Sequence, residues 1–195
     1  MFTIKPVLLK GQNIQLEILD TKHRDDLYQA AQDEIISQYM PNKIQGDKFY
    51  RWFDAALNKK TEQQLPFVVR RQTDGKIIGS SRYYDIQAEH HRLAIGYTWY
   101  IPEVWGTVVN PECKYLLLQH AFEKLSANRV EFIIDARNTR SRAAVKKLGA
   151  IEEGLLRQHV ILENGFIRDS VVFSIIQSEW SVVKTSLEQR LATHL

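Results

Sequence analysis

The residues that could do chemistry gather where a predicted strand ends and a helix begins. Residues 92–100 have the pattern of a strand, and Asn110 and Pro111 are residue types that begin a helix, here predicted over 111–125. The start of a helix presents backbone N–H groups that have no partner inside the helix, and its dipole favours negative charge there. This junction therefore suits a phosphate group. Every strand-to-helix junction has the same geometry, however, so the pattern is equally typical of a junction that binds nothing.

A second group of polar residues surrounds a short predicted helix over 139–148. Asn138 and Ser141 stand at its start, where either side chain can act as a helix cap. Basic residues cluster around the same helix, and they either bind phosphate or form a solvated face. These basic residues are Arg137, Arg140, Arg142, Lys146 and Lys147.

Other catalytic classes find no support in the sequence. Cys113 is the single cysteine, which excludes a disulfide scaffold. Its place near the start of the predicted helix could lower the pKa of its thiol, but we expect inert packing. No spacing of His, Cys, Asp and Glu is typical of a metal site, and no nucleophile elbow supports a Ser-His-Asp triad.

The composition is that of an ordinary globular protein. The chain has 195 residues, of which 44% are hydrophobic and 25% charged, and we expect one domain over residues 1–195. The 26 basic and 23 acidic residues give a net charge of +3, which is too small to predict a nucleic-acid partner. No apolar run approaches the roughly 20 residues that span a membrane, and the N-terminus lacks a signal-peptide pattern, so a cytoplasmic protein is expected.

Hydrophobic periodicity and turn residues predict a mixed α/β (α+β) fold. Asp74-Gly75 and Asn164-Gly165 predict tight hairpins, which join antiparallel strands. Strand, helix and strand over residues 92–135 predict one parallel βαβ crossover. The predicted strands are 13–19, 65–71, 76–84, 92–100, 129–135, 151–162 and 166–176, and the predicted helices are 21–36, 47–60, 111–125, 139–148 and a last one that Ser178 caps.

An ordered set of motifs over nearly the whole chain resembles the GCN5-related N-acetyltransferase (GNAT) superfamily. The sequence is most similar to the branch that contains the ribosomal-protein N-terminal acetyltransferases. The most specific part is Asn138 and Ser141 followed by Lys147-Leu-Gly149 and Glu-Gly-Leu-Leu-Arg157. The other motifs are Leu16-Glu17, Gly79, Ile95-Gly-Tyr-Thr-Trp99, Trp105-Gly106 and Arg168-Asp169.

The resemblance implies that two neighbouring strands splay apart and that acetyl-CoA, the cosubstrate, lies in the gap between them. Its pantetheine arm would pair with the edge of strand 92–100 and contact Asn138. Its diphosphate would lie on the N–H groups that precede and begin helix 111–125, and basic residues would meet the phosphate at its adenine end. The residues assigned to acetyl-CoA in this way are Tyr97, Thr98, Trp99, Trp105, Gly106, Thr107, Val108, Val109, Asn110, Asn138 and Arg142.

The resemblance also implies the reaction, which is transfer of acetyl to a primary amine by direct attack in a ternary complex. The acceptor would be the α-amine of a protein or peptide, or a small amine. Many relatives use a tyrosine to protonate the departing thiolate. This chain has Val145 at that position, so Ser141 would protonate the thiolate instead. The residues themselves predict no metal, no nucleic acid and no membrane partner, and they leave a monomer and a homodimer open.

Two departures from the family pattern keep a second hypothesis open. Val108 and Asn110 replace the glycine or alanine of the family's phosphate loop, and valine tolerates left-handed backbone poorly, so Gly106 would have to supply that freedom. Ala94 replaces a carboxylate that often takes the amine's proton, which favours an acceptor with a weakly basic α-amine. Glu89, His90 and His91 either substitute for that base or form an exposed loop. The alternative function is a catalytically degenerate module that binds CoA weakly or acts through a protein partner.

Overall fold

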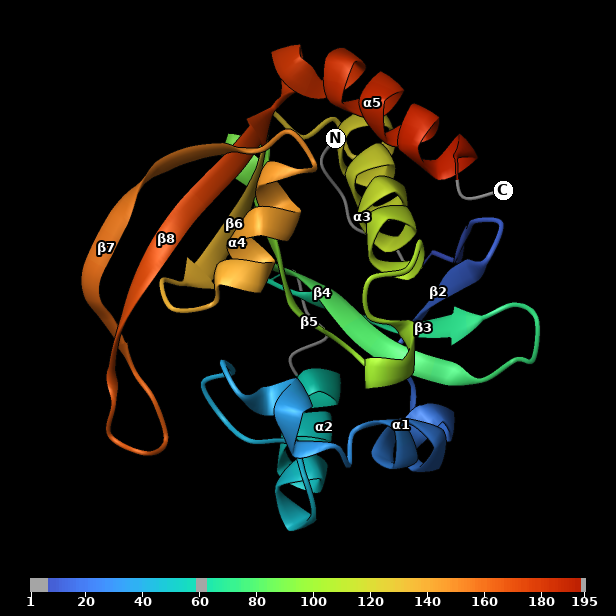
Figure 1. Cartoon of the computed structure of the whole chain (residues 1–195), viewed down its shortest axis with the longest axis vertical. Helices are drawn as coiled ribbons and strands as arrows, with labels where there is room; N and C mark the ends of the chain where they lie inside the picture. Colours follow the sequence, from blue (N-terminus) through green and yellow to red (C-terminus); the bar gives the residue numbers. More distant parts are fainter. Residues whose placement is uncertain (1–6, 59–62, 194–195) are drawn as a thin grey trace.

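A single mixed sheet forms the centre of the molecule (Figure 1). The computed structural model describes residues 7–58 and 63–193. Within them the strands lie side by side in the order β1-β2-β3-β4-β5-β6-β8-β7. The strands are β1 (Leu9–Lys10), β2 (Ile14–Ile18), β3 (Leu65–Arg71), β4 (Ile77–Gln87), β5 (Arg92–Tyr100), β6 (Arg129–Asp135), β7 (Ile151–Ile161) and β8 (Ile167–Ile176).

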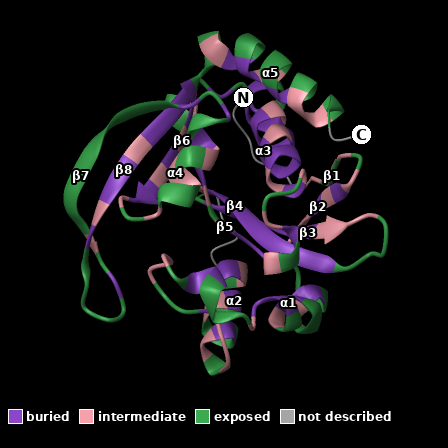
Figure 2. Ribbon diagram, viewed as in Figure 1, coloured by how far each residue is buried: buried purple, intermediate pink, exposed green. Residues whose placement is uncertain are grey.

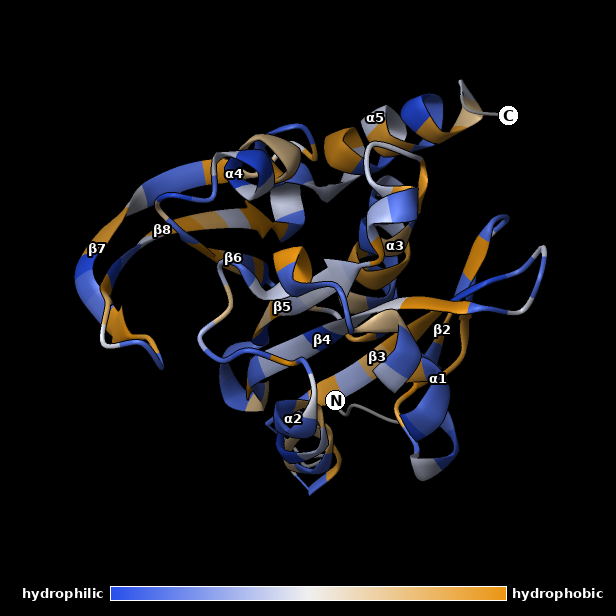
Figure 3. Cartoon of the chain, turned by 60° about the horizontal axis from the view of Figure 1, so that its bottom comes forward, coloured by the Kyte–Doolittle hydropathy of each residue, from blue (hydrophilic) through white to orange (hydrophobic). Residues whose placement is uncertain are grey.

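Helices cover both faces of the sheet, and the buried hydrophobic residues form two clusters. The helices are α1 (Arg24–Ala30), α2 (Asp47–Asn58), α3 (Val109–Gln119), α4 (Thr139–Lys146) and α5 (Trp180–Ala192). α1 and α2 lie on one side of β3–β5 and α3 lies on the other, in both views (Figures 1 and 3). The larger cluster includes Leu117 of α3 and Phe173 of β8, and the smaller one includes Phe49 and Phe53 of α2. β7 forms the outer edge of the sheet and is exposed along nearly all of its length (Figure 2).

The one parallel strand pair, β5 with β6, is short. It extends only from Arg92 opposite Arg129 to Ala94 opposite Glu131, whereas every other pair in the sheet is antiparallel. Beyond Ala94, β5 stays paired with β4 but leaves β6. The mixed sheet, the parallel crossover and the splayed strands are therefore confirmed. No helix within the described residues has both the length and the apolar character needed to cross a bilayer.

Some predicted boundaries were wrong, and local side-chain chemistry explains the largest error. The predicted helix 21–36 is a 3₁₀ turn at Thr21–His23, then α1, then a second 3₁₀ turn at Glu34–Ser37. Asp33 interrupts it, because its carboxylate accepts a hydrogen bond from the Ile35 N–H and so starts a new turn. The two-residue β1 is too short to show a periodicity. The last two residues of the predicted helix 47–60 lie outside the described residues.

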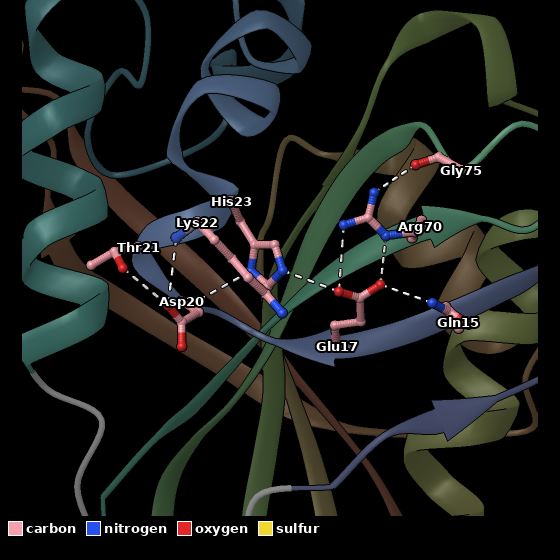
Figure 4. Close-up of polar contacts among 8 residues, drawn as sticks. All are labelled: Gln15, Glu17, Asp20, Thr21, Lys22, His23, Arg70 and Gly75. Atoms are coloured by element: carbon pink, nitrogen blue, oxygen red, sulfur yellow. Dashed lines mark hydrogen bonds and ion pairs between the residues drawn. The ribbon is translucent and has the colours of Figure 1, made fainter.

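Glu17, from the Leu16-Glu17 motif, holds the first helical turn against β2 and β3 (Figure 4). Its carboxylate accepts hydrogen bonds from Arg70, from Gln15 and from Nε2 of His23. The hydrogen bond from Arg70 is the main reason why the pKa of Glu17 falls to about 2. His23 accepts from the Asp20 N–H through Nδ1, so its proton lies on Nε2 and is shared with Glu17. The motif thus has a structural role in this chain.

Glu112 attaches the turn between β1 and β2 to the first turn of α3. Its buried carboxylate accepts hydrogen bonds from the N–H groups of Gln12 and Asn13 and from the Asn13 amide. A Cβ at Gly11 would lie 2.1 Å from the Glu112 Oε1 atom, so the close approach requires glycine there. This attachment fixes the N-terminal end of α3 against the sheet.

Candidate functional site

A cleft of about 810 Å³ opens where β5 and β6 diverge. Its volume falls in the range of small-molecule and cofactor sites. Residues 95–100 of β5 and 132–135 of β6 form two sides, and the loop 104–107, α3 and α4 close the far end. Along this stretch the edge of β5 that faces the cleft has no strand partner, so its N–H and C=O groups are available to an extended ligand.

A β-bulge in β5 shapes the middle of the cleft. Ser80 pairs with Trp99 and Arg82 with Gly96, so that Tyr97 and Thr98 together lie opposite the single residue Ser81. Tyr97 has φ +50°, which is unusual for a residue with a side chain. Tyr97 is 41% exposed and lines the cleft, whereas the Thr98 hydroxyl contacts Ser81 and Lys114 of α3.

The backbone of the loop before α3 has a conformation that valine can adopt at position 108. Gly106 has φ +77° and supplies the left-handed turn, while Val108 is in the ordinary helical region with φ −65°. α3 begins at Val109, so the prediction of Asn110 as cap and Pro111 as first helical residue was wrong by two residues. The Asn110 side chain instead accepts a hydrogen bond from the Tyr100 hydroxyl, 3.2 Å away.

This path leaves donors for a ligand at the start of α3. The Val109 N–H donates to the hydroxyl of Thr107, at 3.3 Å. Within the described part of the chain, no acceptor is found for the N–H groups of Val108 and Asn110. Unused N–H groups at the start of an 11-residue helix are a fitting cradle for a phosphate.

α4 brings the predicted polar residues to the opposite side of the cleft. The Asn138 amide oxygen accepts from the Ser141 N–H at 3.0 Å, so Asn138 caps the helix, and both residues line the cleft. Arg140 lies over the Trp105 ring at 3.8 Å and so connects α4 to the loop before α3. Val145 is 5% exposed and packs in the core.

Most of the predicted cofactor residues meet around this one cleft, and three do not line it. Val108 is the residue before α3, and the side chain of Val109 packs in the core. Arg142 donates to the Ala136 carbonyl and lies near Glu152. The predicted residues that line the cleft are Tyr97, Thr98, Trp99, Trp105, Gly106, Thr107, Asn110, Asn138 and Ser141.

Lys114 is a cleft residue that the sequence did not reveal. It lies one turn after Asn110 on α3 and is 5% exposed, and its Nζ donates to the Thr98 hydroxyl at 2.6 Å. Burial lowers the pKa of Lys114 to about 8. No carboxylate of the described residues pairs with it. Cys113, by contrast, is fully buried, and burial raises the pKa of its thiol, in agreement with inert packing.

His159, beside a bulge in β7, and Arg168 of β8 also line the cleft, and these two residues were also missed. Gln158 has φ +52° and its N–H donates to Asp169. Ser170 Oγ accepts from Arg168 Nε at 3.0 Å and from Nη2 at 2.8 Å, which occupies both of its lone pairs. Its O–H therefore donates to His159 Nδ1, 3.0 Å away, and the neutral imidazole carries its proton on Nε2.

The carboxylates in and near the cleft that could take a proton are bound by arginine side chains. Asp135 is the one acidic residue among the described residues that line the cleft. Burial alone would raise its pKa, but hydrogen bonds from Arg137 lower it. Glu131 pairs with Ala94 in register but forms ion pairs with Arg129 and Arg92. The alternative bases, residues 89–91, precede β5 and do not line the cleft, which agrees with the loop interpretation.

The buried Lys114 predicts a pH dependence of stability in the ligand-free protein. Its pKa is about 8 when folded and near the usual 10.5 when unfolded, so the unfolded chain binds more protons between these values. The free energy of unfolding is expected to rise by up to about 3 kcal/mol from pH 8 to pH 10.5. Urea titrations of the wild type and Lys114→Met measure this rise. Cys113 and Tyr100 nearby have raised pKa values and titrate in both proteins, so only the difference between the curves counts. Parallel curves would contradict the prediction.

Comparison with known proteins agrees with this geometry. A family model described as an acetyltransferase (GNAT) domain matches residues 13–151. YdaF of Bacillus subtilis (strain 168), whose name provisionally makes it a ribosomal N-acetyltransferase, is 32% identical over 108 residues, which are 55% of this chain and 57% of YdaF. The chain thus matches little more than half the length of that relative.

Solved structures match over almost the whole chain. A GCN5-related N-acetyltransferase from Brucella melitensis has a TM-score of 0.90 at 27% identity, covering 96% of this chain and 86% of that one. RimJ from Mycobacterium smegmatis, solved with CoA-disulfide, shares the fold with a TM-score of 0.76 at 18% identity, over 95% of this chain and 92% of that one. Because the family model covers most of the chain and contains the splayed strands and the start of α3, the protein belongs to the GNAT acetyltransferase superfamily.

Proposed function

We propose that this protein transfers an acetyl group from acetyl-CoA to the α-amine of a peptide or protein in the cytoplasm. The observation that carries the proposal is the cleft between β5 and β6, which joins an open strand edge to unused N–H groups at the start of α3. An extended amide chain pairs with the first, and a diphosphate fits the second. Acetyl-CoA supplies both, together with the activated acetyl group.

The absence of a free carboxylate in the described cleft favours an α-amine. An amine must lose its proton before it attacks a carbonyl. A lysine side chain, with a pKa near 10.4, needs a base for this far more than an α-amine with a pKa of about 7.7–8.0. Asp135 is hydrogen-bonded to Arg137, and Glu131 forms ion pairs with Arg129 and Arg92. An α-amine is partly neutral at physiological pH and can react without a dedicated base.

The polar groups on the β7–β8 side are hydrogen-bond donors, which favours an acceptor with carbonyl groups. His159 offers Nε2–H, and Arg168 is a guanidinium that has no carboxylate in hydrogen-bond contact. Both line the cleft. Peptide carbonyls next to the reacting α-amine accept such hydrogen bonds, whereas a polyamine brings only positive charge to a cleft that already contains several basic residues. These basic residues are Lys114, Arg140, Lys147, Arg168 and Arg190.

Ser141 is the residue proposed to protonate the departing thiolate. It lines the cleft at the start of α4, and the helix cap is Asn138, so the Ser141 hydroxyl is not used for capping. The tyrosine that many relatives use has no equivalent, because Val145 stands at that position and has no hydroxyl. Holding both reactants in one cleft supplies much of the rate enhancement by itself.

Calorimetry and an acceptor screen test the proposed function. Acetyl-CoA is expected to bind with micromolar affinity. Mass spectrometry is then expected to show acetyl addition to peptides with a free α-amine, and much less to peptides with a blocked N-terminus and one lysine, or to spermidine. Acetylation of spermidine in preference to peptides would contradict the acceptor assignment. No binding at millimolar acetyl-CoA would contradict catalysis and favour a degenerate module.

Ser141→Ala is expected to lower kcat at least tenfold while leaving the Kd for acetyl-CoA within twofold of the wild type. The reason is that general-acid catalysis contributes a factor of roughly 10²–10⁴, part of which water can replace. Release of free thiol measures turnover, and calorimetry measures binding. A loss in kcat below about twofold with unchanged binding would show that Ser141 is not the acid.

His159→Phe is expected to raise KM for the best peptide acceptor of the screen by about tenfold, because one hydrogen bond to a carbonyl is lost. His159→Gln keeps a side-chain N–H and is expected to recover part of this loss. Steady-state kinetics with the same peptide measures both variants. If instead both variants lost kcat equally below pH 7 and recovered at high pH, His159 would be a base and the donor role would be wrong.

A further inference from the structure

The position of Lys114 is difficult to explain by stability alone. Its side chain is 5% exposed, and it makes one hydrogen bond, to the hydroxyl of Thr98. An ammonium group can donate three hydrogen bonds, and a buried charge is costly unless an opposite charge offsets it. None of the described carboxylates offsets this charge. Glu112, two residues earlier, accepts hydrogen bonds from the turn between β1 and β2 instead. A leucine or methionine at this position would avoid the cost.

The surroundings of Lys114 point to an anionic ligand. Lys114 and Asn110 are four residues apart on α3, so they share the helix face that lines the cleft. A helical side chain tilts back toward the start of its helix, so the stem of Lys114 leans toward the turn that carries the N–H groups of Val108 and Asn110, and its Nζ contacts Thr98 in the cleft. These donors and the ammonium together form one positively charged end of the cleft.

We propose that the ammonium of Lys114 binds the diphosphate of CoA and supplies the positive charge on which this chain relies at its phosphate loop. The inference rests on the proposed function. The other donors at this helix start are neutral backbone N–H groups, and Lys114 is the cation on the same face of α3. A hydrogen bond from a charged donor is roughly twice as strong as one from a neutral donor, so the lysine adds to what the backbone supplies. The lowered pKa of Lys114, about 8, is consistent with a cation that lacks its partner until the ligand binds.

Calorimetric titration of two ligands into matched variants tests the assignment. The ligands are CoA and dephospho-CoA, which lacks the 3′-phosphate but keeps the diphosphate. The variants are Lys114→Met, which removes the charge and the donors, and Lys114→Gln, which keeps a neutral donor. The expected result is a Kd at least tenfold higher for both ligands in both variants. Lys124→Met, a substitution of an exposed lysine outside the cleft, is expected to leave both Kd values unchanged.

Thermal unfolding of the ligand-free variants separates binding from structure. Lys114→Met and Lys114→Gln are expected to unfold at the same temperature as the wild type or higher, because an unpaired buried charge is removed. Saturating CoA is expected to raise the unfolding temperature of the wild type more than that of either variant. A lower unfolding temperature in both ligand-free variants would make Lys114 a structural residue and overturn the inference.

The remaining outcomes are equally decisive. A Kd within twofold of the wild type in Lys114→Met would show that the lysine binds no part of CoA. Normal binding by Lys114→Gln would show that a neutral donor suffices and that the pantetheine, not the diphosphate, is the partner. A loss with CoA alone would assign Lys114 to the 3′-phosphate. Failure of the wild type to bind CoA would overturn the proposed function itself, and a loss confined to the variants would not.

Discussion

The parallel pairing between β5 and β6 stops after Ala94, and the site exists because it stops there. Up to that point the two strands are joined in register, and Glu131 forms ion pairs with Arg92 and Arg129 at the base of the split. Beyond it, the edge of β5 faces a cleft instead of a strand. Backbone N–H and C=O groups without partners are costly to bury, so this edge requires a ligand or water. The bulge at Tyr97 adds a second departure from regular pairing at the same place.

The start of α3 has an ordinary backbone geometry although a valine stands in the turn before it. In the loop before α3, Gly106 is the residue with positive φ, a conformation that glycine adopts without strain. Val108 is accommodated because its own conformation is helical. The whole arrangement is held by Glu112, whose carboxylate attaches this turn of α3 to the β1–β2 turn. A buried lysine on the next turn places positive charge beneath it, at a cost in the stability of the ligand-free fold.

The hairpin of β7 and β8 places mainly hydrogen-bond donors on the other side of the cleft. Its bulge is stabilised by Asp169, and the chain of hydrogen bonds from Arg168 through Ser170 to His159 sets which nitrogen of the imidazole carries the proton. Donors dominate there, and the nearby Asp135 is bound by Arg137. The electrostatics therefore differ between the two sides of the cleft: cations and unused N–H groups lie around the start of α3, and no free carboxylate lies among the described residues of the cleft.

The sequence by itself determined the order of the elements, the two hairpins, the parallel crossover and the membership of Ser141, Asn138 and Trp105 in one site. These follow from local properties, since periodicity, turn residues and motifs act over a few neighbouring residues. Local signals failed at the boundaries of elements, where capping and turn contacts compete with periodicity. Asp33 ended a helix that periodicity would continue, and α3 began before its apparent cap.

Only the tertiary structure decided which residues share the cleft and in what state. Lys114 looks like any lysine of an amphipathic helix until β5 places Thr98 against it. His159 lies in an exposed edge strand, and only the β7 bulge and Ser170 turn it toward the site. Burial and hydrogen-bond geometry depend on residues far apart in the chain, so no local pattern encodes them. Motifs in the chain were enough to identify the family, whereas contacts between distant strands determine which charged groups line the cleft.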